Sequence, residues 1–246
     1  MMGLCVCDIG NKSHSDNSFG NKANIVEARL PKRIAPIHFG VRYHDEPLSF
    51  SLIFASEKSM DRYQMQEVAK WLTGYQEYQW LTIDQPDLEH MQFKCLITNL
   101  TPISVGWLPV AFEANIVCDC AYAYSYPFTQ KYTINDSTTI VYQNKSTCRE
   151  KLRPKLTIEV EAGCTEFSIY NATSGKTTTF SGLPGSAMKF VIDNENCVIT
   201  EELNGINPYN YFNFEFFGLE SGNNRLVVTG KGKITVEGRY LYNVGA

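Results

Sequence analysis

Short segments in which apolar and polar residues alternate run through most of this 246-residue sequence. In the first half they span residues 41–57, 77–84, 91–100 and 110–125. A period of two places successive side chains on opposite faces of a strand, so each segment is expected to form a β-strand. Frequent aromatic residues, 13% of the chain, favour the same structure. These features predict a mainly β fold.

One segment departs from the alternation and predicts a helix within residues 58–75. Its apolar face has residues at positions i, i+3 and i+7, namely Met65, Val68 and Leu72, with Met60 and Trp71 beside them. Ser59 is placed to cap the start of this helix and Gly74 to close its end. One helix among several strands predicts an α+β first domain, which we place at residues 1–126.

After Pro127 the alternation continues in shorter units separated by residues typical of turns. The expected turn segments are NATSGK at 171–176, LPGS at 183–186, DNEN at 193–196, NGINP at 204–208, ESGNN at 220–224 and GKGK at 230–233. About nine strands, spaced roughly 10 residues apart, are typical of a β-sandwich or jelly roll. The second domain is therefore predicted as a β-sandwich over residues 127–246.

Charge and hydropathy exclude several classes of ligand. The formal net charge is −4, and no basic block is present, so sequence-specific binding of nucleic acid is not expected. No apolar run approaches the roughly 20 residues of a membrane-spanning helix, so no membrane association is expected. The N-terminal residues turn polar almost at once, which argues against a secretion signal and favours reduced thiols among the eight cysteines.

Two Cys-x-Cys pairs raise the question of a thiolate metal site. They are Cys5 with Cys7 and Cys118 with Cys120. Structural thiolate sites usually space their cysteines by two to four residues, and the chain has no Cys-x-x-Cys. The histidines also lack metal-like spacing; they are His14, His38, His44 and His90. On a strand the second pair would share one face with apolar neighbours, namely Ile116, Tyr122 and Tyr124. Buried thiols are therefore expected, with no metal and no cofactor.

Other polar clusters are weak candidates for chemistry. His44, Asp45 and Glu46 precede a proline and are expected to lie in a solvated loop rather than to form an acid/base site. Glu201 and Glu202 are expected in a polar turn, with calcium binding or a paired carboxylate as the alternative. The glycosylation sequons begin at Asn135, Asn144 and Asn171. No catalytic residue is predicted, and the protein is not expected to be an enzyme.

An aromatic segment at residues 209–218 leaves two readings open. Alternation puts one set of side chains on one face, namely Tyr209, Tyr211, Asn213, Glu215 and Phe217. It puts the other set into the core, namely Asn210, Phe212, Phe214 and Phe216. The first face is expected to be the outer side of a covered sheet; the alternative is a sugar platform, which would make the protein a carbohydrate-binding module.

The order of signals in the first half resembles a known protein family. The segments are Gly3–Leu4, the helix end Ala69–Leu72, Tyr78–Asp84, Met91–Cys95 and Phe112–Ala114 leading to Cys118–Tyr124. In this order they resemble the distal tail proteins of long-tailed phages of Gram-positive bacteria. The resemblance continues through the second half, as a galectin-like β-sandwich that ends in the strand Ile234–Tyr242. Members of the family usually carry one more strand before the position of Gly3.

The resemblance implies a structural virion protein at the tip of a phage tail. In the family the first domain forms a hexameric ring around a central channel, and the galectin-like domain points outward. The protein would then be a baseplate hub that joins the tail tube to the host-recognition tip. Its expected partners are further copies of itself, the tail tube protein, the tape-measure protein and the tail-tip or receptor-binding protein.

Overall fold

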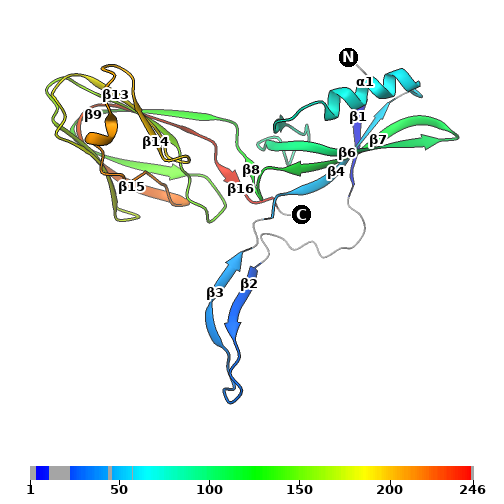
Figure 1. The fold of residues 1–246 in the computed structure, drawn as a ribbon, viewed down its shortest axis with the longest axis horizontal. Helices are drawn as coiled ribbons and strands as arrows, with labels where there is room; N and C mark the ends of the chain where they lie inside the picture. The colour runs from blue at the N-terminus through cyan, green and yellow to red at the C-terminus, as the bar shows by residue number, and fades with distance from the viewer. Residues whose placement is uncertain (1–3, 11–22, 44–45, 57, 245–246) are drawn as a thin grey trace. The chain divides into compact units, whose positions relative to one another are not determined.

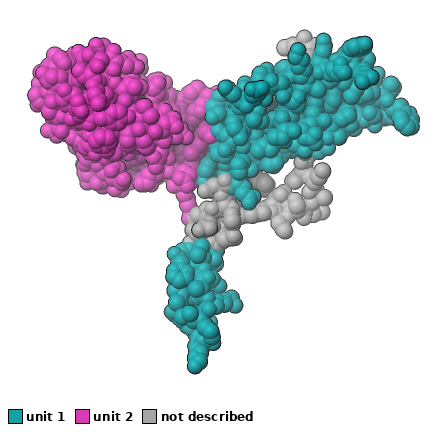
Figure 2. Space-filling model, viewed as in Figure 1, with its two compact units in different colours: residues 1–123, 243–246 teal, residues 124–242 magenta. Residues whose placement is uncertain are grey.

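The computed structural model describes residues 4–10, 23–43, 46–56 and 58–244 (Figure 1). The chain divides into two compact units, residues 1–123 with 243–246 and residues 124–242 (Figure 2). The predicted mainly β class is confirmed: the described residues form strands, one α-helix in the first unit and one 3-10 turn in the second. No helix in the described part of the chain is long and apolar enough to cross a membrane.

The first unit is built on a five-stranded antiparallel sheet of order β1-β4-β7-β6-β5. Its strands are β1 Leu4–Gly10, β4 Ser49–Ser56, β5 Gln79–Leu81, β6 Phe93–Val105 and β7 Leu108–Cys118. Gly106 and Trp107 connect β6 to β7, and both have positive φ, of 56° and 72°. Such a two-residue connection matches the twist of the strands that it joins.

Helix α1, Arg62–Thr73, begins at Asp61 and not at the predicted Ser59. The Asp61 carboxylate accepts a hydrogen bond from the Gln64 backbone N–H at 2.8 Å, and the Gln64 side chain accepts one from the Asp61 N–H at 2.9 Å. This reciprocal capping box satisfies two otherwise unpaired donors, which explains why the helix starts there. It ends at Gly74, as predicted.

The apolar face of α1 lies as predicted. Val68 is buried, in a cluster with Met60 and Phe112. Met65 and Leu72 are partly buried against this cluster, together with Leu100 of β6. Trp71 is 50% exposed, because its position lies beside the i, i+3, i+7 stripe.

The second unit is organised around one long strand, β15 Gly222–Gly238. Strand β9, Phe128–Asn144, pairs with β15 along its whole length. On the other edge of β15, β11 pairs with residues 226–229 and β10 with residues 232–237. The other strands are β8 Ala123–Tyr124, β10 Lys155–Val160, β11 Glu166–Asn171, β12 Lys176–Ser181, β13 Met188–Asp193, β14 Val198–Glu201 and β16 Leu241–Tyr242. β12 extends the sheet beyond β11, β13 and β14 extend it beyond β10, and β8 pairs with β16.

The predicted turn at residues 230–233 is wrong, since β15 continues through it. Gly230 and Gly232 have φ of 127° and 153°, which side chains rarely adopt. A Cβ on Gly230 would lie 2.6 Å from Phe167, and one on Gly232 would collide with the backbone oxygen of Glu159. The two glycines therefore let one strand change direction between its partners β11 and β10.

This change of direction curls the sheet so that its two halves enclose a core. Phe180 of β12 stacks on Phe190 of β13, with ring centroids 4.3 Å apart, and both are fully buried. The core is continuous and apolar, and burial of such side chains is the main contribution to stability. Its fully buried members include Ile134, Leu156, Ile158, Phe167, Ile192 and Leu219.

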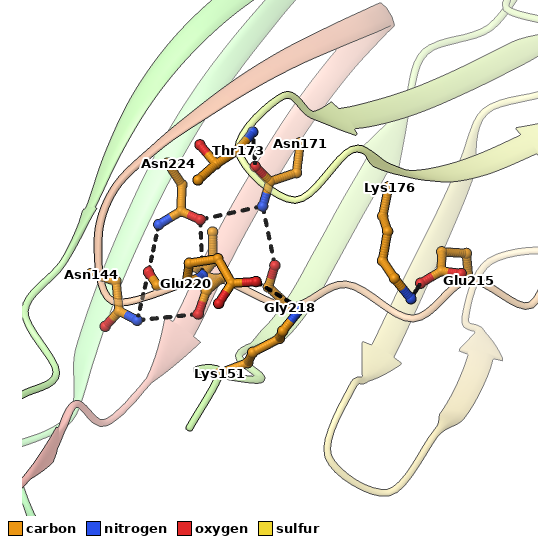
Figure 3. Close-up of polar contacts among 10 residues, drawn as sticks. Asn144, Lys151, Asn171, Thr173, Lys176, Glu215, Gly218, Glu220 and Asn224 are labelled. Atoms are coloured by element: carbon orange, nitrogen blue, oxygen red, sulfur yellow. Dashed lines mark hydrogen bonds and ion pairs between the residues drawn. The ribbon is translucent and has the colours of Figure 1, made fainter. Parts of the chain in front are cut away.

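Three buried asparagines fix the segment that leads into β15 (Figure 3). The Asn144 amide donates to the backbone oxygens of Leu219 and Glu220, at 3.2 and 3.1 Å. The Asn171 amide donates to the Gly218 oxygen at 3.2 Å and to the Asn224 side-chain oxygen at 3.3 Å. Buried polar groups are stable when paired in this way.

Candidate functional site

A two-stranded ribbon in the first unit is the clearest candidate for a functional surface. It consists of β2 Ala23–Ala28 and β3 Ile37–Tyr43, drawn as a long hairpin in Figure 1. The strands are antiparallel, with Ile25 opposite Val41 and a bulge between Val26 and Glu27. Within the described residues they pair with each other and with no other strand.

The ribbon exposes large apolar side chains on both strands. Ile25 is 64% exposed on β2, and Phe39 is 67% exposed on β3. Val26, Leu30 and Ile34 are also exposed. An isolated two-stranded hairpin is marginally stable in water, and exposed apolar patches mark interaction surfaces. The ribbon therefore has the character of a surface that another chain covers.

The connection between β2 and β3, residues 29–36, is basic and contains two prolines that restrain its backbone. It contains Pro31 and Pro36, and the Arg33 N–H donates to the Leu30 oxygen at 3.1 Å. Arg29 forms an exposed ion pair with Glu27 at 3.5 Å. Lys32 and Arg33 add two more positive charges. The ribbon thus combines apolar strands with a basic tip.

A second apolar surface of the first unit lies at the C-terminal end of α1. It includes a cavity of about 290 Å³ with mainly apolar walls. Its lining includes Phe54, Trp71, Tyr75, Trp80, Ile97 and Ile116. Away from this cavity, Trp107 at the tip of the β6–β7 hairpin is 98% exposed. Aromatic side chains with this exposure are typical of protein interfaces.

The cysteines do not form the expected continuous stripe. Cys118 is the last residue of β7 and is buried opposite Cys95 of β6. The strand ends there, so Cys120 lies in the following bend, where its thiol donates to the Tyr122 oxygen at 3.4 Å. The predicted common face of Cys120 with Tyr122 and Tyr124 is therefore wrong.

The environment of the buried thiols disfavours the thiolate. Burial, with the nearby Asp119 charge, raises the pKa of Cys95 to about 11. Burial, with Cys95 and Asp119, raises the pKa of Cys118 to about 12. The thiolate is the form that binds metals, so both side chains are poor ligands at neutral pH.

No metal centre is formed by the part of the chain that the structure describes, where no group of three or more His, Cys, Asp or Glu side chains converges. Cys5 and Cys7 lie on β1, but their side chains lie outside the described residues, as do His14 and His44. His38 is exposed on β3, and His90 is exposed beside Glu89. The absence of metal and cofactor sites stays a prediction.

The remaining polar candidates have local partners or fall outside the description. Asp45 is not described, and Glu46 is exposed. The Glu201 carboxylate accepts hydrogen bonds from the Leu203 and Asn204 N–H groups, at 3.0 and 2.7 Å. Partial burial opposes these bonds, but they hold the pKa of Glu201 below its usual value. Glu202 forms an ion pair with Lys189 at 2.8 Å.

Two of the three sequon asparagines are inaccessible. Asn144 and Asn171 are each 1% exposed and belong to the buried asparagine group. Asn135 lies exposed on β9.

The aromatic segment at residues 209–218 is not a strand, which corrects its predicted faces. Pro208–Asn210 forms a 3-10 turn, and Phe214 has a φ of 60°. The irregular backbone buries Phe212 and Phe217 and leaves Phe214 64% exposed. The flat platform of Tyr209, Tyr211, Asn213, Glu215 and Phe217 is therefore absent from the structure. Glu215 instead lines a separate cavity, together with Phe216 and Phe217.

The ribbon was not predicted, although its sequence carried a signal. Residues 23–28 and 37–43 flank a connection with two prolines, and both flanks are rich in β-branched and aromatic residues. The segment 41–57, predicted as one strand, instead contains the end of β3 and the whole of β4.

Two β-rich units with exposed apolar surfaces are typical of a protein that assembles with other chains. Comparison with protein families makes this class specific. The model described as "Phage tail protein N-terminal domain" matches residues 1–120, and the model described as "Phage tail C-terminal domain" matches residues 122–237. The chain belongs to this family of phage tail proteins with N- and C-terminal domains. No curated protein sequence matches it.

Solved structures identify the fold. The Dit protein (gp 19.1) of phage SPP1, described as a paradigm of the hub adsorption apparatus in Gram-positive infecting phages, aligns with a TM-score of 0.67. The alignment has 12% sequence identity and covers 97% of this chain and 94% of the Dit chain. The chain therefore has the Dit fold. Chains of the phage P2 baseplate in its activated conformation, with Ca and with Sr, align at TM-scores of 0.46 and 0.45 and 12% and 13% identity, covering 96% of this chain and 90% of each of those chains.

Proposed function

We propose that this phage tail protein is a distal tail hub, which assembles into a ring and connects the tail tube to the host-recognition tip. The observation that carries the proposal is the β2–β3 ribbon, which exposes Ile25 and Phe39 and pairs with no further described strand. Its location would be the tip of the tail in the virion. No enzymatic activity is part of the proposal.

A ring accounts for the exposed ribbon in physical terms. A marginally stable hairpin gains stability when a second chain covers its apolar side chains. In a closed ring of head-to-tail contacts every copy covers its neighbour in the same way, so no ribbon stays exposed. The resemblance to distal tail proteins makes six the expected number of copies.

The two units would then have different roles. Residues 1–126 would form the ring, and residues 127–246, the galectin-like domain, would face outward. The tail tube and tape-measure proteins would contact the ring, and a tail-tip or receptor-binding protein would lie beyond it. A net charge of −4 is compatible with a channel through which DNA passes without being retained.

Light scattering of the full chain tests the proposal. The wild-type chain is expected to form hexamers, alone or when the tail tube protein is added. The double substitution Ile25→Asp and Phe39→Asp should leave the chain monomeric, because a carboxylate on each strand opposes burial of the ribbon. Val141→Asp is the matched control, since Val141 is also a strand residue and is 68% exposed.

Two outcomes would contradict the proposal. One is a wild-type chain that stays monomeric both alone and with tail tube protein. The other is a ribbon variant that assembles as the wild type does. Circular dichroism of both variants shows whether the units remain folded.

A further inference from the structure

The second unit contains a cavity that is separate from the proposed ring surfaces. It has a volume of about 290 Å³ and lies among β12, the turns after β11 and β13, and the irregular segment before β15. Its lining includes Lys151, Arg153, Ser174, Lys176, Glu215 and Phe216 (Figure 3 shows part of it). Ligand sites span roughly 300–1,000 Å³, so this one is of a size for a single sugar unit.

The charge of the lining is opposite in sign to the net charge of the chain. Lys151 pairs with Glu220 at 2.7 Å, and Lys176 pairs with Glu215 at 2.6 Å. Arg153 also lines the cavity, and no described residue supplies it with a carboxylate partner. An unpaired guanidinium carries several donors in a planar fork that matches a phosphate or a carboxylate. The cavity therefore favours an anionic ligand.

The wall of the cavity is held in place before any ligand binds. The Thr178 hydroxyl donates to the Glu215 backbone oxygen at 2.9 Å, and the Phe217 N–H donates to the buried Asn194 side-chain oxygen at 2.7 Å. The Asn171 amide holds the Gly218 oxygen. A preorganised wall reduces the entropic cost of binding.

One side of the cavity offers an aromatic surface. Phe216 is partly buried. Its ring packs edge-to-face with the ring of Phe212, with the two centroids 5.1 Å apart. An aromatic ring beside fixed polar donors is the combination that binds a sugar, which has an apolar face and hydroxyls at its rim.

We propose that this cavity binds a saccharide unit that carries a negatively charged group, either a phosphate or a carboxylate. Arg153 contacts the charged group, and Lys151 and Lys176 each contribute N–H donors that their carboxylate partners leave unused. The ring of the sugar lies against Phe216. This binding activity belongs to the second unit and does not require ring assembly.

Calorimetric titration of the full chain tests this inference with four probes: glucose 1-phosphate, glucuronate, glucose and inorganic phosphate. One or both of the charged sugars should bind, and the comparison between them identifies the preferred anion. Glucose and inorganic phosphate should each bind at least about tenfold more weakly, because each lacks one part of the recognised group. Binding should weaken as salt is added.

Variants of the cavity make the test specific. Arg153→Gln and Lys176→Gln should each weaken binding of the charged sugar by about tenfold or more. Lys131→Gln, which removes the same charge from an exposed position on β9 away from the cavity lining, should leave it unchanged. Light scattering should show the same assembly for all three variants, so failure here is distinguishable from failure of the ring.

Three results would overturn the inference. The first is that neither charged sugar binds. The second is that inorganic phosphate binds as tightly as glucose 1-phosphate, which would indicate an anion site with no preference for sugar. The third is that Arg153→Gln binds the charged sugar as the wild type does.

Discussion

The two units differ in how far they bury their large apolar side chains. The second unit encloses most of its large apolar residues between the halves of one curled sheet, as the stack of Phe180 on Phe190 shows, and leaves only a few, such as Phe214, exposed. The first unit leaves many on its surface, among them Ile25, Phe39 and Trp107. The second unit thus has a closed core of its own, whereas the exposed apolar residues of the first unit have the character of an interaction surface, as the proposed ring requires.

Separating the units would give the largest effect. A fragment of residues 124–242 should be a folded monomer, while the full chain assembles, because the surfaces that need covering lie in the first unit. Light scattering of both, with thermal denaturation of the fragment, measures this. A stable oligomer of the fragment would reverse the comparison.

A change at the bend of β15 should damage the second unit selectively. Gly232→Ala forces a side chain into a backbone conformation that costs about 1–3 kcal/mol, and it adds the collision with Glu159. Gly163→Ala is the control, because Gly163 has a φ of 88° but its Cβ would meet no neighbour. Urea denaturation of the fragment should show a clearly greater loss for Gly232→Ala. Equal losses would mean that the close approach to Glu159 is unimportant.

A pair of helix substitutions sharpens the description of the first unit. Val68→Ala should cost about 1–3 kcal/mol, since Val68 is 2% exposed in the cluster with Met60 and Phe112. Trp71→Ala should cost less despite the larger side chain, because half of Trp71 is in contact with solvent. Urea denaturation at a concentration where the chain is monomeric compares the two. A larger loss of stability for Trp71→Ala would mean that α1 packs on its sheet in a different orientation, with Trp71 buried.

Lowering the pH should reduce the thermal stability of the second unit, and this effect should be the smallest of those predicted here. Hydrogen bonds from Asn196 hold the pKa of Asp193 below its usual value, and those from Asn204 and Leu203 do the same for Glu201. A carboxyl with a lower pKa in the folded state stabilises it above the unfolded pKa, about 4, and this stabilisation is lost as the pH falls through the folded pKa. The melting temperature of residues 124–242 should therefore fall below pH 4, and less steeply in Asp193→Asn. An equal slope in that variant would show that Asp193 does not contribute.

Local pattern predicted much of the fold. Alternation placed the starts of β6 and β7 within two residues, although β6 ends five residues later than predicted and β7 seven residues earlier. The spacing of Met65, Val68 and Leu72 identified the buried side of α1. The helix start was missed because Ser59 and Asp61 are both good caps. The reciprocal bond with Gln64 favours Asp61.

Other features depend on partners that are distant in the sequence. The sequence Gly-Lys-Gly-Lys at 230–233 is compatible with a turn and with a bent strand. Pairing of β15 with β9, β10 and β11 determines that it forms a strand. The aromatic run at 209–218 has the pattern of a strand, yet the positive φ of Phe214 interrupts it, so that Phe214 is exposed and Phe217 is buried. The cavity proposed to bind a saccharide combines Lys151, Lys176 and Glu215 from separate parts of the sequence, so no local sequence motif predicts it.

The pairing of β9 with β15 has a consequence for how the second unit forms. Phe128 lies opposite Gly238, so β9, the first long strand of this unit, can pair only after β15, the last long strand, has been synthesised. Contacts of such large sequence separation slow folding, because a long loop must close before they form. During synthesis the curled sheet of the second unit cannot close until β15 has left the ribosome. The strands β4, β6 and β7 of the first unit are synthesised earlier, so this sheet can form before the second unit is complete.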